Sequence, residues 1–293
     1  MFNLKRVRGL LLAVQHRLSS RHIAALVCGA GVSWPDVRLA PRRVLVGSSI
    51  SIALVPHLGE GDQAVLFATR FGEEPEVVNW LETAAPHLYD IVLEIGANNG
   101  FFSVFLDALI RSMPSAKLRS VVSFEPSLEA FQRLLANLAA NDAVHVSPFR
   151  AAVGTAAGFQ AFFMPRGHLA NGSLLRSFAA QCADEIDEQT VAVIDAASLE
   201  YFFTGIDRAL LKIDAEGYEP QILQSLDPLI ERHRPDIVIE VLAATAQAIE
   251  DFAARAGYRR FLLTPAGPQT RERVSADRDF RDWLLCAART GEV

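Results

Sequence analysis

The sequence predicts an α/β fold in which a mainly parallel sheet carries helices on both of its faces. The main observation is that short apolar runs with strand character alternate with helix-like runs from residue 91 to residue 263. Such alternation is typical of parallel sheets, because each strand needs a crossover before the next one. The residues that follow the first two apolar runs support the same fold. The first apolar run, 91–95, ends in a glycine turn, and the second, 120–124, ends in Glu125.

The glycine turn reads Gly96-Ala97-Asn98-Asn99-Gly100. In a dinucleotide fingerprint, G-x-G-x-x-G, the second glycine lets the backbone approach a pyrophosphate. Asn98 stands at that position and carries a side chain into the space that a pyrophosphate would need. We therefore expect a cofactor with adenosine but no pyrophosphate, and S-adenosylmethionine fits this description. Gly96, Asn98 and Gly100 are expected to line its methionine and ribose side.

Glu125 lies at the tip of the second strand, 29 positions after Gly96. A carboxylate has two oxygens, so it can accept hydrogen bonds from both ribose hydroxyls. Pro126 turns the chain off the strand and is expected to shape the adenine wall. Backbone groups of the turn at Ala152 are expected to contact adenine, and Asp142 is a candidate for contact with the adenine amine.

The remaining elements follow from apolar spacing and from breaker residues. The first 75 residues indicate a helical and irregular leader. The expected elements up to the third strand are a strand at 43–46, a strand near 64–68, a helix at 74–85, the strand at 91–95, a helix at 101–113, the strand at 120–124, a helix at 128–141 and a strand at 144–153.

The second half continues the alternation and closes with a strand that we expect to run antiparallel to its neighbours. Its expected elements are an extra strand at 158–164, a loop at 165–173, a strand at 191–194, a helix at 196–203, a strand at 209–214, a helix at 219–232, a strand at 236–241, a helix at 243–256, a strand at 258–263 and the last strand at 283–288.

Length and composition indicate a globular protein of 293 residues, 51% hydrophobic and 21% charged. We divide it into a leader, 1–75, and a catalytic domain, 76–293. The three cysteines are scattered without metal-ligand spacing, which favours a reduced compartment. The apolar run 10–14 is too short for a signal-peptide core or a membrane span. We therefore expect a cytoplasmic protein.

The charge of −6 is unevenly distributed, because residues 1–43 hold eight Lys or Arg and a single Asp. This basic arm is suited to peripheral contact with anionic lipid or acidic glycan, and a solvated helix is the alternative. The acidic remainder argues against a nucleic acid partner, since no basic stripe would neutralise phosphates. The sequence is compatible with a homodimer.

Several motifs resemble the FkbM family of S-adenosylmethionine-dependent methyltransferases. The likeness runs from residue 91 to residue 288 and includes "VLEIGANNGFFS", "VSFEPSLEAFQRLLANLAAND", "FRAAVG", "LLKIDAEGYEPQIL" and "PDIVIEV". The most distinctive part is D-x-E-G-x-E, formed here by Asp214, Glu216, Gly217 and Glu219.

The resemblance implies a class I methyltransferase fold: a Rossmann-like, seven-stranded, mainly parallel sheet with helices on both faces. It also implies O-methylation of hydroxyls on sugars, glycans or secondary metabolites, with S-adenosylmethionine as the methyl donor. Two features depart from the family pattern. Glu94, which we expect to contact the cofactor through its carboxylate, stands where the first strand often has Asp, and the leader has no counterpart.

Asp214 and Glu216 are the leading catalytic candidates, because they follow the fourth core strand at the crevice where α/β sheets bind ligands. Either one is suited to take the acceptor proton or to hold the acceptor hydroxyl. Glu240 ends the next strand, so Asp214 and Glu240 could also hold Mg²⁺ through oxygen ligands. Glu219 is expected to serve the helix N-terminus, and Lys212 to pair with a core carboxylate.

His168 is a third candidate base, since it lies in a loop near the crevice and an imidazole titrates near neutral pH. Asn171 and Ser173 in the same loop are candidates for substrate or cofactor contact. His145, placed inside the third strand, and His233, placed before a proline, are expected to be structural.

Three alternatives remain open at the level of the sequence. An N- or carboxyl-methyltransferase would need no strong base. A nucleotide-binding oxidoreductase would share the fold, but Asn98 argues against it. A non-catalytic cofactor-binding partner subunit would keep the cofactor site and dispense with Asp214.

Overall fold

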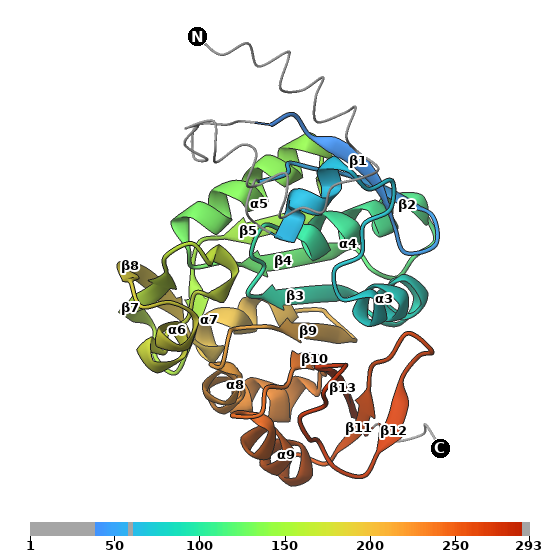
Figure 1. Ribbon diagram of the computed structural model, residues 1–293. Helices are drawn as coiled ribbons and strands as arrows, with labels where there is room; N and C mark the ends of the chain where they lie inside the picture. The colour runs from blue at the N-terminus through green and yellow to red at the C-terminus, as the bar shows by residue number, and fades with distance from the viewer. Residues whose placement is uncertain (1–38, 58–60, 289–293) are drawn as a thin grey trace.

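The computed structural model describes residues 39–57 and 61–288. Its main sheet has the strand order β12-β11-β13-β10-β9-β3-β4-β5 (Figure 1). Strands β3, β4, β5, β9 and β10 are parallel to one another, whereas β13 is antiparallel to both β10 and β11. The bounds are β3 (Ile91–Ile95), β4 (Ser120–Phe124), β5 (Val146–Phe149), β9 (Ala209–Ile213), β10 (Asp236–Glu240), β11 (Tyr258–Leu262), β12 (Gln269–Arg271) and β13 (Asp282–Ala287).

The predicted seven-stranded, mainly parallel sheet with an antiparallel last strand is therefore confirmed, and β12 is an eighth strand that we did not predict. Its three residues are all exposed and polar, so they give no apolar signal. Strand β12 pairs only with β11 among the described strands.

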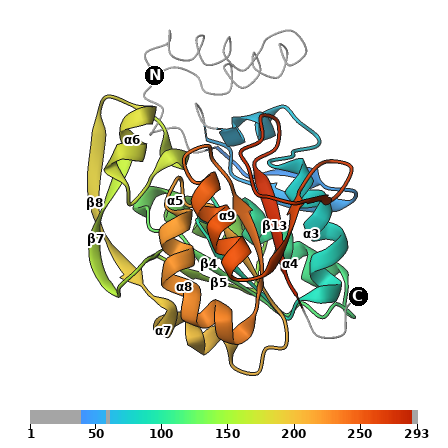
Figure 2. The ribbon, with the colours of Figure 1, turned by 90° about the horizontal axis from the view of Figure 1, so that it is seen from below.

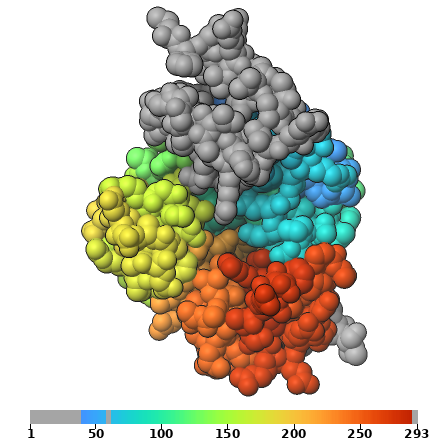
Figure 3. Space-filling model, viewed as in Figure 1, coloured from blue at the N-terminus to red at the C-terminus, as the bar shows by residue number. Residues whose placement is uncertain are grey.

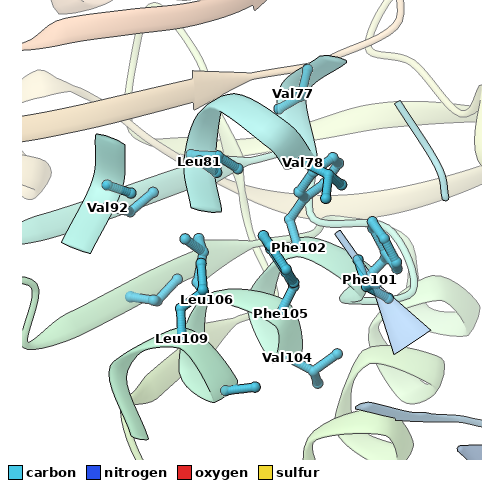
Figure 4. Close-up of a cluster of buried hydrophobic side chains, with 14 of the residues drawn as sticks. Val77, Val78, Leu81, Val92, Phe101, Phe102, Val104, Phe105, Leu106 and Leu109 are labelled. Carbon is cyan, nitrogen blue, oxygen red and sulfur yellow. The ribbon is translucent and has the colours of Figure 1, made fainter. Parts of the chain in front are cut away.

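Helices cover both faces of this sheet, as predicted (Figure 1). One face is covered by α3 (Pro75–Leu88), α4 (Phe101–Ser112) and α5 (Leu128–Ala140). The other is covered by α7 (Ala196–Leu199), η4 (Glu200–Phe203), α8 (Glu219–His233) and α9 (Ala246–Arg255). Alternate residues of each strand contribute to the cores on the two faces, because successive side chains of a strand point to opposite sides of the sheet. In β3, Val92 joins the core under α3 and α4 (Figure 4), whereas Leu93 joins the core over α8.

A separate three-stranded sheet has the order β6-β8-β7 and comprises β6 (Ala152–Val153), β7 (Gly158–Pro165) and β8 (Ile186–Ile194). It lies to one side of the main sheet with α6 (Arg176–Cys182) (Figure 2), and it forms the yellow surface in the space-filling view (Figure 3). Strand β8 begins five residues before the predicted start. The prediction missed its first half because those residues are mostly polar and largely exposed. Helix α6 was not predicted, and its one buried side chain explains the missing signal.

The single third strand predicted at 144–153 is wrong, since the segment divides into β5 of the main sheet and β6 of the small sheet. Strand β5 is an edge strand and contains Pro148, which has no N–H for a ladder. His145 was placed inside this strand but precedes it, and its backbone N–H and ring Nδ1 both contact Asp107 Oδ1 at 3.0 Å. His145 is thus structural, as expected.

Part of the predicted leader packs on the catalytic core. Strands β1 (Arg42–Val46) and β2 (Ile50–Leu54) form an antiparallel pair, and Val44, Ile52 and Leu54 are buried in the core of α3 and α4. The second predicted strand, at 64–68, is wrong, because residues Gly61–Leu66 form the short 3₁₀ helix η2. The division of the chain at residue 75 remains a prediction.

Some expectations fall outside the described residues. These are the apolar run 10–14, Cys28 and most of the basic arm over 1–43. Among residues 39–57 and 61–288, no helix is long and apolar enough to cross a membrane.

Candidate active site

The glycine turn between β3 and α4 has a backbone that only small or specially held residues adopt. Gly96 has φ 88° and Gly100 has φ 79°, both in the left-handed region. A Cβ at Gly96 would lie 1.7 Å from the carbonyl oxygen of Asp214. The ends of β3 and β9 therefore approach so closely that no side chain fits between them.

Asn98 also has a left-handed backbone, with φ 48°. This conformation is uncommon for a residue with a side chain, although asparagine is among the residues that tolerate it best. Its N–H donates to Glu125 Oε2 at 2.8 Å, which joins the turn to the end of β4. The two features singled out in the sequence are therefore in direct contact.

Glu125 is 6% exposed, and both of its carboxylate oxygens accept backbone hydrogen bonds. Oε1 accepts from the N–H of Ser127, the N-cap residue of α5, at 2.8 Å. Burial raises the pKa of Glu125 to about 7, although the two backbone donors favour the ionised form. Each oxygen retains a second lone pair, so the carboxyl group can still accept hydrogen bonds from a ligand.

A cavity opens at the carboxyl ends of β3, β4 and β9. Of the predicted cofactor residues, those that line it are Gly96, Asn98, Glu125, Pro126 and Ala152. The catalytic candidates Asp214 and Glu216 line it too, together with Leu169, Ala170 and Gly172 from the predicted contact loop. The structure therefore brings seven of the predicted site residues to one cavity.

The other four predicted residues do not belong to the described lining of this cavity. Glu94 lies behind it, 1% exposed, where Oε2 accepts from Ser103 Oγ at 2.5 Å. Burial raises the pKa of Glu94 to about 7. Gly100 packs against Leu134, and a Cβ there would lie 2.7 Å from Leu134 Cδ1.

Asp142 and His168 are also not among the residues that line the cavity. Asp142 follows α5 in a left-handed turn with φ 49°, and His168 immediately precedes the short helix η3 (Leu169–Asn171). The contacts predicted for them, with adenine and with the acceptor proton, remain predictions.

Lys212, near the end of β9, is a buried cation that lies between the carboxylates of Asp214 and Glu74. Its Nζ lies 3.4 Å from Asp214 Oδ2 and 3.6 Å from Glu74 Oε2, and it stands 4.4 Å from the ring centroid of Phe102. Burial alone would lower the pKa of Lys212, but the charges of Glu74 and Asp214 outweigh it and raise the pKa. Lys212 is therefore charged, and its expected pairing with a core carboxylate is confirmed.

Glu216, two residues after Asp214 beyond the end of β9, and Glu240, at the end of the neighbouring strand β10, both interact electrostatically with Asp214, as predicted. Burial, with the nearby charge of Asp214, raises the pKa of Glu216 to about 9 and that of Glu240 to about 8. Both groups thus hold a proton at neutral pH, which relieves the repulsion among the three carboxyl groups. Glu216 Oε1 also accepts a long hydrogen bond of 3.4 Å from Asn171 Nδ2.

Glu219 supports the backbone that carries Asp214 and Glu216. Its Oε1 accepts from the N–H groups of Ala215 at 2.9 Å and Gly217 at 3.1 Å, at the start of α8. This is the role at a helix N-terminus that the sequence favoured.

Sequence reasoning missed Glu73 and Glu74, which come from the segment before α3. Burial, with the charge of Glu74, raises the pKa of Glu73 to about 7. Glu74 has φ 44° and approaches Lys212. The pattern Glu-Glu-Pro signals a helix start, but nothing local indicates that these carboxyls meet β9.

The magnesium site predicted at Asp214 and Glu240 is not supported. Within residues 39–57 and 61–288, no group of three or more His, Cys, Asp or Glu has an arrangement suited to a metal ion. The Lys212 ammonium already accompanies Asp214, and Arg281 Nη1 lies 3.5 Å from Glu240 Oε1.

Comparison with known proteins identifies one family. The family model described as "Methyltransferase FkbM domain" matches residues 94–260. No curated protein matches the chain.

Solved structures also resemble it. The methyltransferase FkbM from Methylobacillus flagellatus KT has 18% identity and a TM-score of 0.41, over 67% of this chain and 43% of that one, so the chain spans less than half of that protein. SMU.1697c, a putative methyltransferase from Streptococcus mutans in complex with SAH, has 11% identity and a TM-score of 0.42, over 73% and 98%. The ribosomal protein L11 methylase from Lactobacillus delbrueckii subsp. bulgaricus has 13% identity and a TM-score of 0.41, over 85% and 98%.

Proposed function

The chain belongs to the FkbM family of S-adenosylmethionine-dependent methyltransferases, and from this premise we propose that it methylates a hydroxyl oxygen of a sugar, a glycan or a secondary metabolite. Methyl transfer from S-adenosylmethionine follows from the family, whereas the oxygen and the acceptor class are our proposal. The observation that carries it is that Glu125, Asp214 and Glu216 line one cavity.

The cavity fits S-adenosylmethionine. Gly96 and Asn98 line it beside Glu125, whose buried carboxyl oxygens are placed to accept from ribose hydroxyls, and the side chain of Asn98 stands where a pyrophosphate site has a glycine. When bound, S-adenosylmethionine supplies an electrophilic methyl group attached to a positively charged sulfur. The protein then has to orient the acceptor and remove its proton, and orientation contributes about 7–11 kcal/mol in well-aligned model reactions.

Asp214 and Glu216 support a hydroxyl as the acceptor. A hydroxyl group both donates and accepts hydrogen bonds. The Asp214 carboxylate, whose charge is balanced by Lys212, can accept its proton, whereas protonated Glu216 can donate to its oxygen. The pair therefore suits an alcohol oxygen of a polyol, such as a sugar ring.

Of the predicted bases, Asp214 is the one we favour. It lines the cavity, whereas His168 lies outside the described lining, and Glu216 holds its proton at neutral pH. In this proposal a carboxylate oxygen of Asp214 takes the proton from the substrate hydroxyl, and protonated Glu216 donates a hydrogen bond to the oxygen of that hydroxyl.

Three other readings remain as outcomes of the test. The acidic cluster would also attract an ammonium group, which favours N-methylation as the second candidate. A carboxyl acceptor would have to approach several acids, and a non-catalytic subunit would bind the cofactor without transfer.

The test is incubation of the full chain with S-adenosylmethionine carrying a trideuterated methyl group and a panel of methyl glycosides, amino sugars and uronic acids. Mass spectrometry detects transfer, and heteronuclear NMR identifies the methylated atom. Transfer to a hydroxyl oxygen, abolished in Asp214→Asn, supports the proposal. An N-methyl or methyl-ester product contradicts it, and wild-type activity in Asp214→Asn removes Asp214 as the base.

A further inference from the structure

Asn137, on α5, joins the glycine turn to the end of β2. It is 0% exposed, and both ends of its amide are used. Its Oδ1 accepts from the backbone N–H of Val55 at 2.8 Å, and its Nδ2 donates to the backbone carbonyl of Asn99 at 2.8 Å. One side chain therefore connects the end of β2 with the turn that lines the cofactor cavity.

The turn is held from two sides. The N–H of Asn98 is bound by Glu125, and the carbonyl of the next residue, Asn99, is bound by Asn137. Asn98 has φ 48°, a sparsely populated conformation that persists only where surrounding contacts fix it. Asn137 supplies one of these contacts, so a loss of its hydrogen bond would let the turn relax.

Strand β2 is itself anchored to α5 by a second asparagine one helical turn later. Asn141 Oδ1 accepts from the N–H of Ala53 at 2.8 Å, and its Nδ2 donates to the carbonyl of Ala53 at 2.6 Å. Asn141 is 4% exposed, and its Nδ2 also donates to the backbone carbonyl of Asn137 at 2.8 Å. Within the described residues it makes no hydrogen bond to the glycine turn. Asn137 on α5 and Asn141 at its C-cap are both buried, and both bind the backbone of residues 53–55, but of the two only Asn137 bonds to the turn in the described part of the chain.

We propose that Asn137 is a positioning residue for the methyl donor, through which residues 42–55 become part of the cofactor site. These residues precede the segment 94–260 that defines the family. The proposal rests on the cofactor binding described above and adds to it a structural contribution from β2. In physical terms, Asn137 keeps the turn in its binding geometry before the donor arrives, so that donor binding does not have to order it.

The experiment compares Asn137→Ala and Asn137→Leu with the matched controls Asn141→Ala and Asn141→Leu. The leucine variants preserve side-chain volume, which separates the lost hydrogen bonds from a cavity. Calorimetry measures the Kd for S-adenosylhomocysteine, thermal unfolding measures stability, and hydrogen exchange follows the amides of residues 97–101. All four variants should be destabilised, because each leaves backbone groups of β2 without their partner.

Both Asn137 variants should bind S-adenosylhomocysteine about tenfold more weakly than the wild type and exchange the amides of 97–101 faster. Both Asn141 variants should retain the wild-type affinity and exchange at that turn. Equal affinity in the two series overturns the proposal. So does unfolding of both Asn137 variants beside folded Asn141 variants, since Asn137 would then be needed for the fold itself. A wild type that does not bind S-adenosylhomocysteine would instead contradict the cofactor assignment, and the exchange at 97–101 would still test the link through Asn137.

Discussion

Lys212 Nζ lies 3.4 Å from Asp214 Oδ2, and the lysine is only 4% exposed. The favoured base is thus paired with a buried cation at the end of the same strand. Glu74, Glu94 and Asp282 also raise the pKa of this ammonium, so Lys212 is the charge that lets several buried acids coexist.

Replacement of Lys212 by methionine should lower the free energy of unfolding by about 3–5 kcal/mol at pH 8, because it leaves buried carboxylates without their cation. The loss should be smaller at pH 5, where those carboxyls take up protons. Urea unfolding at both values measures this. Lys117→Met is the control, since Lys117 is partly exposed beside Asp90 and Asp207 and should contribute about 1 kcal/mol or less. An equal loss at the two pH values would exclude a charge effect.

The raised pKa values of Glu216 and Glu240 predict that the protein loses stability as the pH rises. In the folded protein Glu216 keeps its proton up to about pH 9 and Glu240 up to about pH 8, whereas both groups lose their protons near the ordinary pKa of 4.5 in the unfolded chain. Their contribution is therefore fully present below pH about 4.5 and is lost as the pH rises through the folded values. The free energy of unfolding should fall between pH 5 and pH 9, and Glu216→Gln with Glu240→Gln should flatten the curve. A curve unchanged by both substitutions would contradict these values.

Replacement of Glu125 by alanine should weaken S-adenosylhomocysteine binding by about 1–3 kcal/mol, because the variant loses the expected ribose acceptor and frees the N–H of Asn98. The affinity of Glu125→Gln should lie between those of the wild type and Glu125→Ala, since its amide has a single acceptor oxygen. Calorimetry gives the affinities. Glu129→Gln is the control, because Glu129 is exposed on α5. Wild-type affinity in Glu125→Ala would remove Glu125 from the cofactor site.

Replacement of Gly96 by alanine should destabilise the protein by more than about 3 kcal/mol, because the new Cβ combines an unfavourable positive φ with a collision against the Asp214 carbonyl. Gly257→Ala is the matched control. Gly257 has φ 68°, and its Cβ would meet nothing within 4 Å, so only the conformational strain of about 1 kcal/mol should remain. Thermal unfolding of both variants measures the difference. Similar melting temperatures would show that the strand ends can separate.

Much of the core could be predicted from local pattern, because buried parallel strands such as 91–95 and 209–213 are apolar except for Glu94 and Lys212. Glu125 and Asn98 were found for the same reason, since their positions follow directly from strand ends. Elements without an apolar signal were missed or misplaced. Helix α6 buries a single alanine. Residues 64–68 are misplaced for a different reason: the apolar run suggested a strand, but its first three residues end the 3₁₀ helix Gly61–Leu66.

The site was predictable only where its residues share a local motif. Asp214 and Glu216 belong to one such motif, whereas Glu74 reaches Lys212 across 138 positions and Asn137 reaches Val55 across 82. No spacing rule relates residues so far apart, because packing of the helices decides which of them meet. The contact of Asp142 with the adenine amine stays a prediction, since Asp142 is not among the residues that line the cavity.

The protons kept inside the acidic cluster also alter how the molecule moves in an electric field. The formal charge of −6 counts every acid as ionised, whereas the folded chain retains protons on Glu216 and Glu240 at pH 7. Native and urea-denatured forms therefore differ in net charge as well as in size. The folded protein should focus at a higher isoelectric point than the same chain in urea.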